Sequence, residues 1–413
     1  MRRVWRVVYL LCFLCIIGSF GAFWCLERLD VSLPDCLGVE KNRSYLEGKT
    51  YASFPDPTVE SFAEGEFQAG IEDYVADRFP ARDNVLLLNA AWQRSLITCS
   101  ARLFGYDVYP TFYGSDYAYD EPRDEVVQVL DEATPTLRER YEAAAEAYRD
   151  FADRHPELRC YFYEVDRMSS SSRNPTHDLV GPSVDTEFLD EHFFDLLGES
   201  VVRIDGSFAD TDELSSAFFR TDHHWGAPAA YDEYEKMLSV MLPDAAPAEV
   251  TERVTWEEVP FYGSTVRSGL CLTKEPDYIE DLLVDMSGYT VAVDGKERDA
   301  SSLDHASAYA RGEVGEDPFT NRYAEYFHGD FGLLEIGNAS SQTDRVLLIV
   351  GDSFDNCVDR YFAANYRTVY VFDPRHASTG VEELLSSNEV DDVLFLMGST
   401  VFPLEENYAR LSK

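Results

Sequence analysis

Basic residues are few in this sequence. Lysine and arginine together number 35 against 76 aspartates and glutamates, which gives a formal net charge of −41. Proteins that bind nucleic acid or dock on anionic lipid need clustered positive charge to neutralise phosphates. The composition therefore excludes both classes. It favours a solubilising acidic surface, and a high-salt habitat would also fit.

Closely spaced cysteine pairs are absent outside the N-terminal apolar run. Three of the eight cysteines fall in that run, and the other five are widely spaced. Structural zinc sites use Cys-x-x-Cys pairs, so none is predicted. The odd number leaves room for one disulfide without indicating its pairing. The five are Cys36, Cys99, Cys160, Cys271 and Cys357.

Charge is missing from residues 7–26. About 20 apolar residues are enough to cross a bilayer as a helix. The arginines within residues 1–6 predict that this short N-terminus stays in the cytoplasm. A cleaved signal peptide is the alternative, because residues 18–22 weakly resemble a cleavage site. We expect an uncleaved transmembrane signal anchor, and in either case the bulk of the protein is exported.

The rest of the chain predicts one large α/β domain. Residues 27–57 show little periodicity and are expected to form a stalk, followed by a catalytic domain over residues 58–413. Short apolar runs separated by helical stretches are typical of a parallel sheet flanked by helices on both faces. Residues 243–337 are less regular and predict a β-rich insertion. The apolar runs are residues 158–165, 201–205, 346–350, 368–372 and 393–397.

Residues 105–119 hold six aromatic side chains among glycine and proline. Such clusters can stack on sugar rings, but packing of a loop against its own domain is the more common use. We expect packing here.

Four consecutive residues, Asp222 to Trp225, combine a carboxylate, two imidazoles and an indole. Burying an unpaired Asp or His costs more than a hydrogen bond returns, so a hydrophobic core does not explain this group. In an extended backbone, residues two apart point to the same side. The Asp222 carboxylate can then accept a hydrogen bond from Nδ1–H of His224, which leaves Nε2 free to act as a base.

Ser353 is the predicted nucleophile for this base. Residues 345–350 indicate a buried strand, and residues 351–354 follow it as a strand-to-helix turn. Reactive groups in an open α/β sheet gather beyond the carboxyl ends of the strands, so Ser353 and His224 can reach one edge. At a helix start, Ser353 would gain from the helix dipole, and its own N–H could donate to an oxyanion. The predicted chemistry is acyl transfer through a Ser353–His224–Asp222 triad.

The same residues have other interpretations. Aspartate and histidine are good metal ligands. Adjacent histidines are not expected to converge on one ion, however, so no metal is predicted. His223 is expected to point away from His224 and to be structural. Trp225 is assigned to substrate binding as a sugar-stacking wall, and packing beneath the imidazole is the alternative.

The Asp222–Trp225 motif resembles the name-giving motif of the bacterial DHHW family, exported SGNH-hydrolase-like proteins similar to the alginate O-acetyltransferases. Further segments resemble that family, and the likeness covers most of residues 60–400. The order, with Asp and His ahead of Ser, departs from standard SGNH hydrolases and is similar to the alginate enzymes. The further segments are Asp77–Asp83 (Asp-Arg-Phe-Pro-Ala-Arg-Asp), Gly351–Phe354 and Asp373–Arg375.

The resemblance implies an SGNH-like fold, an acetyl-serine intermediate and transfer to a polysaccharide hydroxyl. It also implies a membrane-bound O-acyltransferase partner, and no cofactor is expected. The first hypothesis is therefore a membrane-anchored, extracytoplasmic O-acetyltransferase that modifies a cell-envelope or exported polysaccharide. A carbohydrate esterase with the same triad is the second, with water as the acceptor. A non-catalytic glycan-binding or assembly subunit is the third.

Overall fold

The computed structural model describes residues 43–79, 81–177, 187–303 and 317–413, and positions 10, 11, 14 and 18. Its contacts divide the chain into two units, residues 1–96 and 97–413. The predicted cytoplasmic segment 1–6, nearly all of the predicted transmembrane helix 7–26, and residues 27–42 lie outside the described residues. Within the described part, no helix combines the length and apolar character that crossing a membrane requires.

The first unit is helical, with a small hairpin in the range predicted as a stalk. The hairpin pairs β1 (Arg43–Ser44) with β2 (Lys49–Thr50), and it is followed by α2 (Val59–Glu64) and α3 (Glu66–Asp77). Helix α4 (Arg82–Phe104) contains the boundary between the two units.

The predicted family segment 77–83 anchors this hairpin through charged side chains. Asp77 accepts from Lys49 Nζ at 2.6 Å and from the Ala52 N–H at 2.8 Å. Arg82 forms two hydrogen bonds of 2.8 Å with the Glu47 carboxylate. These contacts give the segment a structural role within the first unit.

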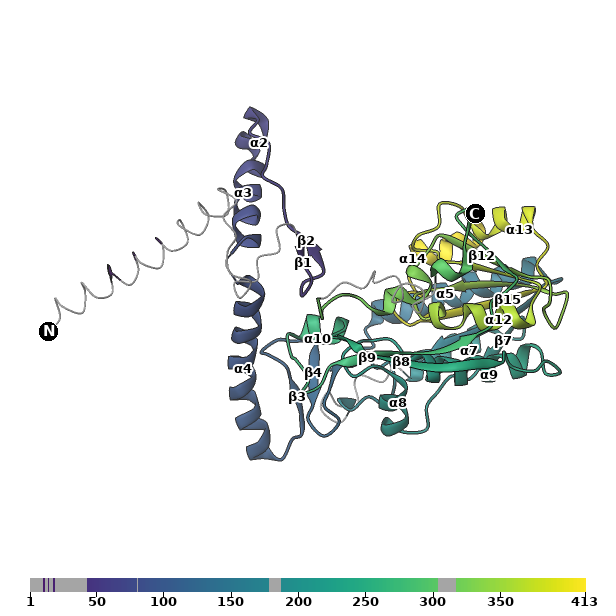
Figure 1. The fold of residues 1–413 in the computed structure, drawn as a ribbon, viewed down its shortest axis with the longest axis horizontal. Coiled ribbons are helices and arrows are strands. Elements are labelled where there is room, and N and C mark those ends of the chain that lie inside the picture. Colours follow the sequence, from purple (N-terminus) through teal and green to yellow (C-terminus); the bar gives the residue numbers. More distant parts are fainter. Residues whose placement is uncertain are drawn as a thin grey trace. The chain divides into compact units, whose positions relative to one another are not determined.

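A central eight-stranded sheet forms the second unit (Figure 1). Its strand order is β11-β10-β12-β14-β13-β15-β6-β7. The five strands from β14 to β7 are mutually parallel, and β11, β10 and β12 extend the sheet in antiparallel fashion. The bounds are β6 Arg159–Val165, β7 Val201–Ile204, β10 Tyr289–Val293, β11 Lys296–Arg298, β12 Leu333–Asn338, β13 Val346–Gly351, β14 Thr368–Phe372 and β15 Asp392–Gly398.

The α/β prediction is confirmed as a central sheet flanked by helices, with two corrections. The sheet is mixed rather than parallel, and part of the predicted insertion 243–337 belongs to it, because β10 and β11 and the start of β12 lie in that range. Strands β8 (Val250–Phe261) and β9 (Asp277–Val284) form a separate two-stranded sheet there. The reason is that a local hydrophobic pattern predicts where strands lie but does not predict which strands pair with one another.

Side chains of β13 alternate between two cores, as the period of two in a strand requires. Leu347 and Ile349 pack into one core with α9 (Ala227–Met241) and α12 (Asp359–Asn365). Leu348 and Val350 pack into the other. The helices of that second core are α5 (Pro135–Arg154), α7 (Glu187–Leu197) and α13 (Val381–Ser387).

Smaller elements complete the second unit. The aromatic stretch 105–119 lies in a three-stranded antiparallel sheet, where Tyr109 and Tyr119 are buried and pack edge-to-face with centroids 6.0 Å apart. The packing interpretation therefore holds for these two side chains. The remaining elements are β3 Val108–Pro110, β4 Tyr117–Asp120, β5 Glu125–Gln128, α8 Thr211–Ala217, α10 Ser264–Gly269, α14 Glu405–Tyr408 and the 3₁₀ helices η2 Ala300–Leu303, η3 Tyr323–His328, η4 Asp355–Cys357 and η5 Ala409–Ser412.

Candidate active site

The 222–225 motif lies in a loop between α8 and α9. The ends of the loop are joined by an antiparallel bridge between Phe218 and Trp225. The Phe219 N–H donates to the His224 carbonyl at 3.0 Å, which closes the loop further. These bonds fold residues 219–224 into a closed turn that holds Asp222 and His224 next to each other.

Three side chains form one continuous chain of hydrogen bonds. His224 Nδ1 lies 2.5 Å from Asp222 Oδ1, and His224 Nε2 lies 2.8 Å from Ser353 Oγ. Asp222 and His224 are 3% and 4% exposed, whereas Ser353 is half-buried and remains accessible. With the Nδ1 proton shared with the carboxylate, Nε2 can accept the hydroxyl proton of Ser353.

Asp222 stays ionised although it is buried. Burial raises its pKa, but His224, His223 and the hydrogen bond from the Ser264 N–H outweigh burial and hold the pKa well below the usual value. The Ser264 N–H donates to Oδ2 at 2.6 Å. An ionised Asp222 can fix the His224 tautomer and stabilise an imidazolium.

A glycine makes this support of Asp222 feasible. A Cβ built on Gly263 would lie 2.3 Å from Asp222 Cβ and 2.4 Å from its Oδ2. Only a residue without a side chain lets the backbone at 263–264 approach the carboxylate so closely. The neighbouring Thr221 is fixed in turn, because its N–H and hydroxyl both donate to Asp277 Oδ2, at 2.8 and 2.5 Å.

Ser353 follows β13 directly, at the carboxyl edge of the parallel strands. Its neighbour Asp352 accepts from the Phe354 N–H at 3.1 Å and from the Gly398 N–H at 2.9 Å. These two bonds tie the turn to the end of β15. The predicted helix start at Ser353 is wrong, because a 3₁₀ turn intervenes and α12 begins only at Asp359. The helix-dipole argument for Ser353 therefore does not apply.

Tyr323 covers the base, and sequence reasoning missed it. Its ring stacks on His224 with centroids 3.7 Å apart and an interplanar angle of 4°. The tyrosine is 1% exposed and belongs to η3, 99 residues after His224 in the chain. This contact fixes the plane of the imidazole. No local pattern around Tyr323 signals it.

Known proteins share this fold. No protein-family model matches the chain, and no curated protein matches it in sequence. Among solved structures, a DHHW family protein from Eubacterium siraeum aligns over 74% of this chain and 94% of its own length, at 18% identity and a TM-score of 0.55. The chain has the fold of a DHHW family protein. The predicted resemblance is confirmed at that level.

Two further structures are similar. Bacillus cereus PatB1 with a sulfonyl adduct aligns over 70% of this chain and 96% of its own length, at 16% identity and a TM-score of 0.54. The O-acetyltransferase domain of Pseudomonas putida AlgJ aligns over 72% and 96%, at 12% identity and a TM-score of 0.38. The lower score leaves PatB1 and the DHHW family protein as the basis of the fold comparison.

The predicted substrate-binding role of Trp225 is wrong in this structure. The indole is 0% exposed, and its Nε1–H donates to the Phe354 carbonyl at 3.0 Å. A fully buried ring offers no face to a sugar. Trp225 instead ties the 222–225 loop to the residue after Ser353, so it positions both halves of the site.

The expected orientation of His223 is also wrong. Its ring lies 3.8 Å from the His224 ring, and its Nδ1 lies 2.5 Å from Ser264 Oγ. Burial, together with the positive charges of His224, Arg167 and Arg267, lowers the pKa of His223 well below its usual value, against the opposing effect of Asp222. With His223 neutral, the negative charge of Asp222 is available to His224.

The adjacent histidines do converge, contrary to expectation. Asp222, His223 and His224 each offer a ligand atom, and these atoms lie within 4.8 Å of one another. Carboxylate and imidazole suit zinc and similar ions. An ion here would have to displace the Asp222–His224 hydrogen bond and the bond from His223 to Ser264. The donor set therefore fits a hydrogen-bonded role better than a metal site.

The predicted family segment 373–375 directly follows β14, and its charged side chains form ion pairs. Arg375 Nη2 donates to Asp373 at 2.6 Å and to Asp330 at 2.9 Å. Asp330 also accepts from Asn356 Nδ2 at 3.0 Å. Since its charges are paired internally, this cluster stabilises the edge beside β14.

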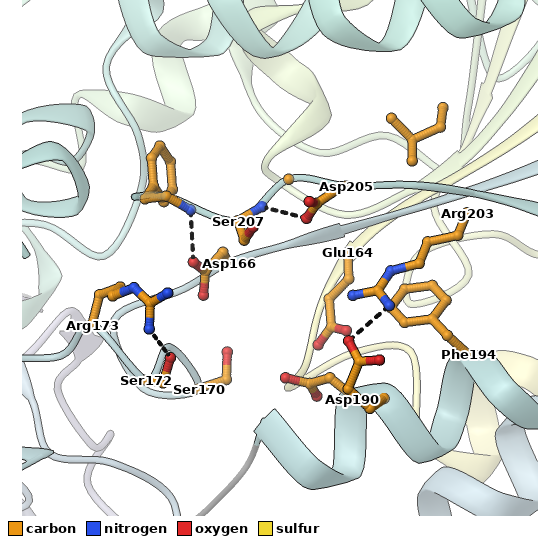
Figure 2. Close-up of a pocket in the computed structure, with 14 residues that line it drawn as sticks. Glu164, Asp166, Ser170, Ser172, Arg173, Asp190, Phe194, Arg203, Asp205 and Ser207 are labelled. Atoms are coloured by element: carbon orange, nitrogen blue, oxygen red, sulfur yellow. Dashed lines mark hydrogen bonds and ion pairs between the residues drawn. The ribbon is translucent and has the colours of Figure 1, made fainter. Parts of the chain in front are cut away.

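A cavity with a mostly polar lining lies at the carboxyl ends of β6 and β7 (Figure 2). It measures about 390 Å³, a size typical of small-ligand sites. Polar side chains from β6, α7 and β7 and from the segments after the two strands line it, and burial raises the pKa of Asp166 to about 6. Arg203 forms an ion pair of 2.8 Å with Glu191, so one of the two arginines that line the cavity is already neutralised. The polar lining is Glu164, Asp166, Ser170, Ser172, Arg173, Asp190, Glu191, Arg203, Asp205 and Ser207.

Proposed function

We propose that this protein is an extracytoplasmic O-acetyltransferase that acts on a cell-envelope or exported polysaccharide through an acetyl-serine intermediate. The carrying observation is the hydrogen-bond chain from Asp222 through His224 to Ser353, at 2.5 and 2.8 Å. The shared fold with a DHHW family protein and PatB1 supports the proposal.

The reaction has two halves. Ser353 Oγ attacks the acyl carbon while His224 Nε2 takes its proton, and the protonated imidazole then gives that proton to the leaving oxygen. In the second half, His224 takes a proton from the acceptor hydroxyl, whose oxygen attacks the acetyl-serine. The bond from the acyl carbon to Ser353 Oγ then breaks, and the imidazolium returns the proton to that oxygen. Asp222 remains ionised in both halves and stabilises the imidazolium.

The proposal includes membrane anchoring through residues 7–26. It also includes a membrane-bound O-acyltransferase that delivers acetyl groups. An anchor would hold the catalytic unit close to such a partner. The net charge of −41 disfavours polyanionic acceptors. Neutral and amine-bearing oligosaccharides are therefore the first acceptors to try.

The direct test is mass spectrometry of residues 27–413 after incubation with 4-nitrophenyl acetate. We expect one added acetyl group on Ser353, and none after Ser353→Ala substitution. Acetate release without acceptor modification, in the presence of the oligosaccharides above, would favour the esterase. If neither acetylation nor hydrolysis occurs, the protein is not an enzyme of this class and the glycan-binding hypothesis gains.

A further inference from the structure

Arg167 lies in the loop after β6 and is 6% exposed. Its Nη1 donates to Thr400 Oγ1, and its guanidinium carbon lies 5.7 Å from the centre of the Phe354 ring. A Cβ on Gly398 would lie 2.5 Å from Arg167 Cδ, so the glycine makes room for the arginine stem. The side chain thus crosses the end of β15 and reaches the residue after Ser353.

Within the described residues, this buried cation is not in ion-pair contact with any carboxylate, and its Nε–H has no hydrogen-bond partner. Burial lowers the pKa of the guanidinium, although Asp352 and Asp131 act against this at longer range. An unpaired buried charge opposes folding, so an arginine held in this way indicates a partner that arrives with the substrate.

Arg167 also lies beside Asp222 and His223. With Asp222 and His223 it lines a small cavity, into which Thr265, 4% exposed and with no hydrogen-bond partner for its hydroxyl, also projects. The arginine therefore borders the catalytic cluster from the β6 side. A guanidinium carries five N–H donors and stays protonated throughout acyl transfer.

We propose that Arg167 is a catalytic residue that stabilises the negative oxygen of the tetrahedral intermediate on Ser353. This inference rests on the proposed function. When Ser353 Oγ bonds to the acyl carbon, the carbonyl π electrons move to oxygen, and His224 holds the hydroxyl proton. The guanidinium and the Ser353 N–H then donate to that oxygen until the carbonyl re-forms and the leaving oxygen departs with the proton. Arg167 neither gains nor loses a proton.

The kinetic test uses Arg167→Met and Arg167→Lys, with Arg149→Met as the matched control on α5. The acylation rate of Ser353 is measured with saturating 4-nitrophenyl acetate. Loss of one oxyanion donor lowers such rates by about 10²- to 10³-fold, and we expect this for Arg167→Met. Arg167→Lys should recover part of the rate, and Arg149→Met should match the unsubstituted protein.

Thermal unfolding of each variant separates catalysis from folding. Acylation at the normal rate by folded Arg167→Met would overturn the proposal. If the unsubstituted protein is itself never acetylated on Ser353, the proposed function fails and this inference falls with it.

A structural test does not depend on the variants folding. Methanesulfonyl fluoride would place tetrahedral sulfonyl oxygens on Ser353, which imitate the oxyanion. We expect one of them within hydrogen-bond distance of an Arg167 nitrogen in a crystal structure of the adduct. Sulfonyl oxygens that meet only backbone N–H groups, with the guanidinium beyond contact, would overturn the proposal.

Discussion

Two buried carboxylates line the same small cavity and behave oppositely. Asp222, in the loop between α8 and α9, is 3% exposed, and its pKa is held well below the usual value. Glu125, on β5, is 2% exposed, and burial raises its pKa to about 7 in spite of a hydrogen bond from Ser215. Two equally buried carboxylates can therefore differ in charge, because the hydrogen-bond donors and charged groups around each one decide its ionisation state.

The two carboxylates therefore differ in protonation: Asp222 is ionised, whereas Glu125 binds a proton near neutral pH. Asp222 accepts from His224 and from the Ser264 N–H, so its ionised form is the stable one. Glu125 accepts a single hydroxyl hydrogen bond and takes up a proton near neutral pH. We therefore expect catalysis to depend on the first carboxylate, and pH-dependent stability to depend on the second.

The largest effect should come from Asp222→Asn. The Asn amide can present its NH₂ group to Nδ1, which favours the wrong His224 tautomer, and it lacks the negative charge that stabilises the imidazolium. The acylation rate of Ser353 should therefore fall by about 10³- to 10⁴-fold. Stopped-flow measurement of nitrophenol release tests this, with circular dichroism as the control for folding. A loss below tenfold would mean that the carboxylate is not needed.

Glu125→Gln should change stability rather than activity. The folded pKa of about 7 lies above the ordinary value, so the folded state holds a proton that the unfolded state has lost. Between pH 5 and 8 the unsubstituted protein should lose about 2–3 kcal/mol relative to the Gln variant. Urea unfolding at three pH values measures this, and a difference independent of pH would contradict it.

Gly263→Ala should displace Asp222 without changing its carboxylate, because residues 263–264 pack against that side chain. The added Cβ would lie 2.3 Å from Asp222 Cβ, so the carboxylate or the backbone must move. A displaced catalytic group commonly costs about tenfold to a hundredfold in rate. Gly226→Ala is the matched control, since its nearest neighbour is Pro228 Cδ at 3.7 Å. Equal activity of both variants would show that Asp222 tolerates the shift.

Tyr323 should give the smallest change. Tyr323→Phe keeps the ring stacked on His224 and should retain activity, whereas Tyr323→Leu removes it and should lower the rate by about tenfold. Thermal unfolding of both variants is the second readout. A rate that falls only as far as the folded fraction falls would limit the tyrosine to packing.

Local chemistry was enough to find the central residues. Asp222, His224 and Ser353 stand out because no hydrophobic core needs them in those positions, and the strand before Ser353 is a plain apolar run. The same reasoning failed for Trp225, since sequence cannot tell whether an aromatic ring faces a sugar or a core. It also placed a helix at Ser353, where the chain first makes a 3₁₀ turn.

The sequence by itself determined the kinds of side chain available, the parallel strands and the pairing of Asp222 with its near neighbour His224. Only the tertiary structure decided that Ser353, which the sequence had proposed, meets His224, and which other distant groups surround the two. Ser264 lies 42 residues from Asp222, Ser353 lies 129 from His224, and Arg167 reaches Thr400 across 233. Such contacts follow from strand order and chain path. These depend on the packing of the whole sheet and leave no trace in a local pattern.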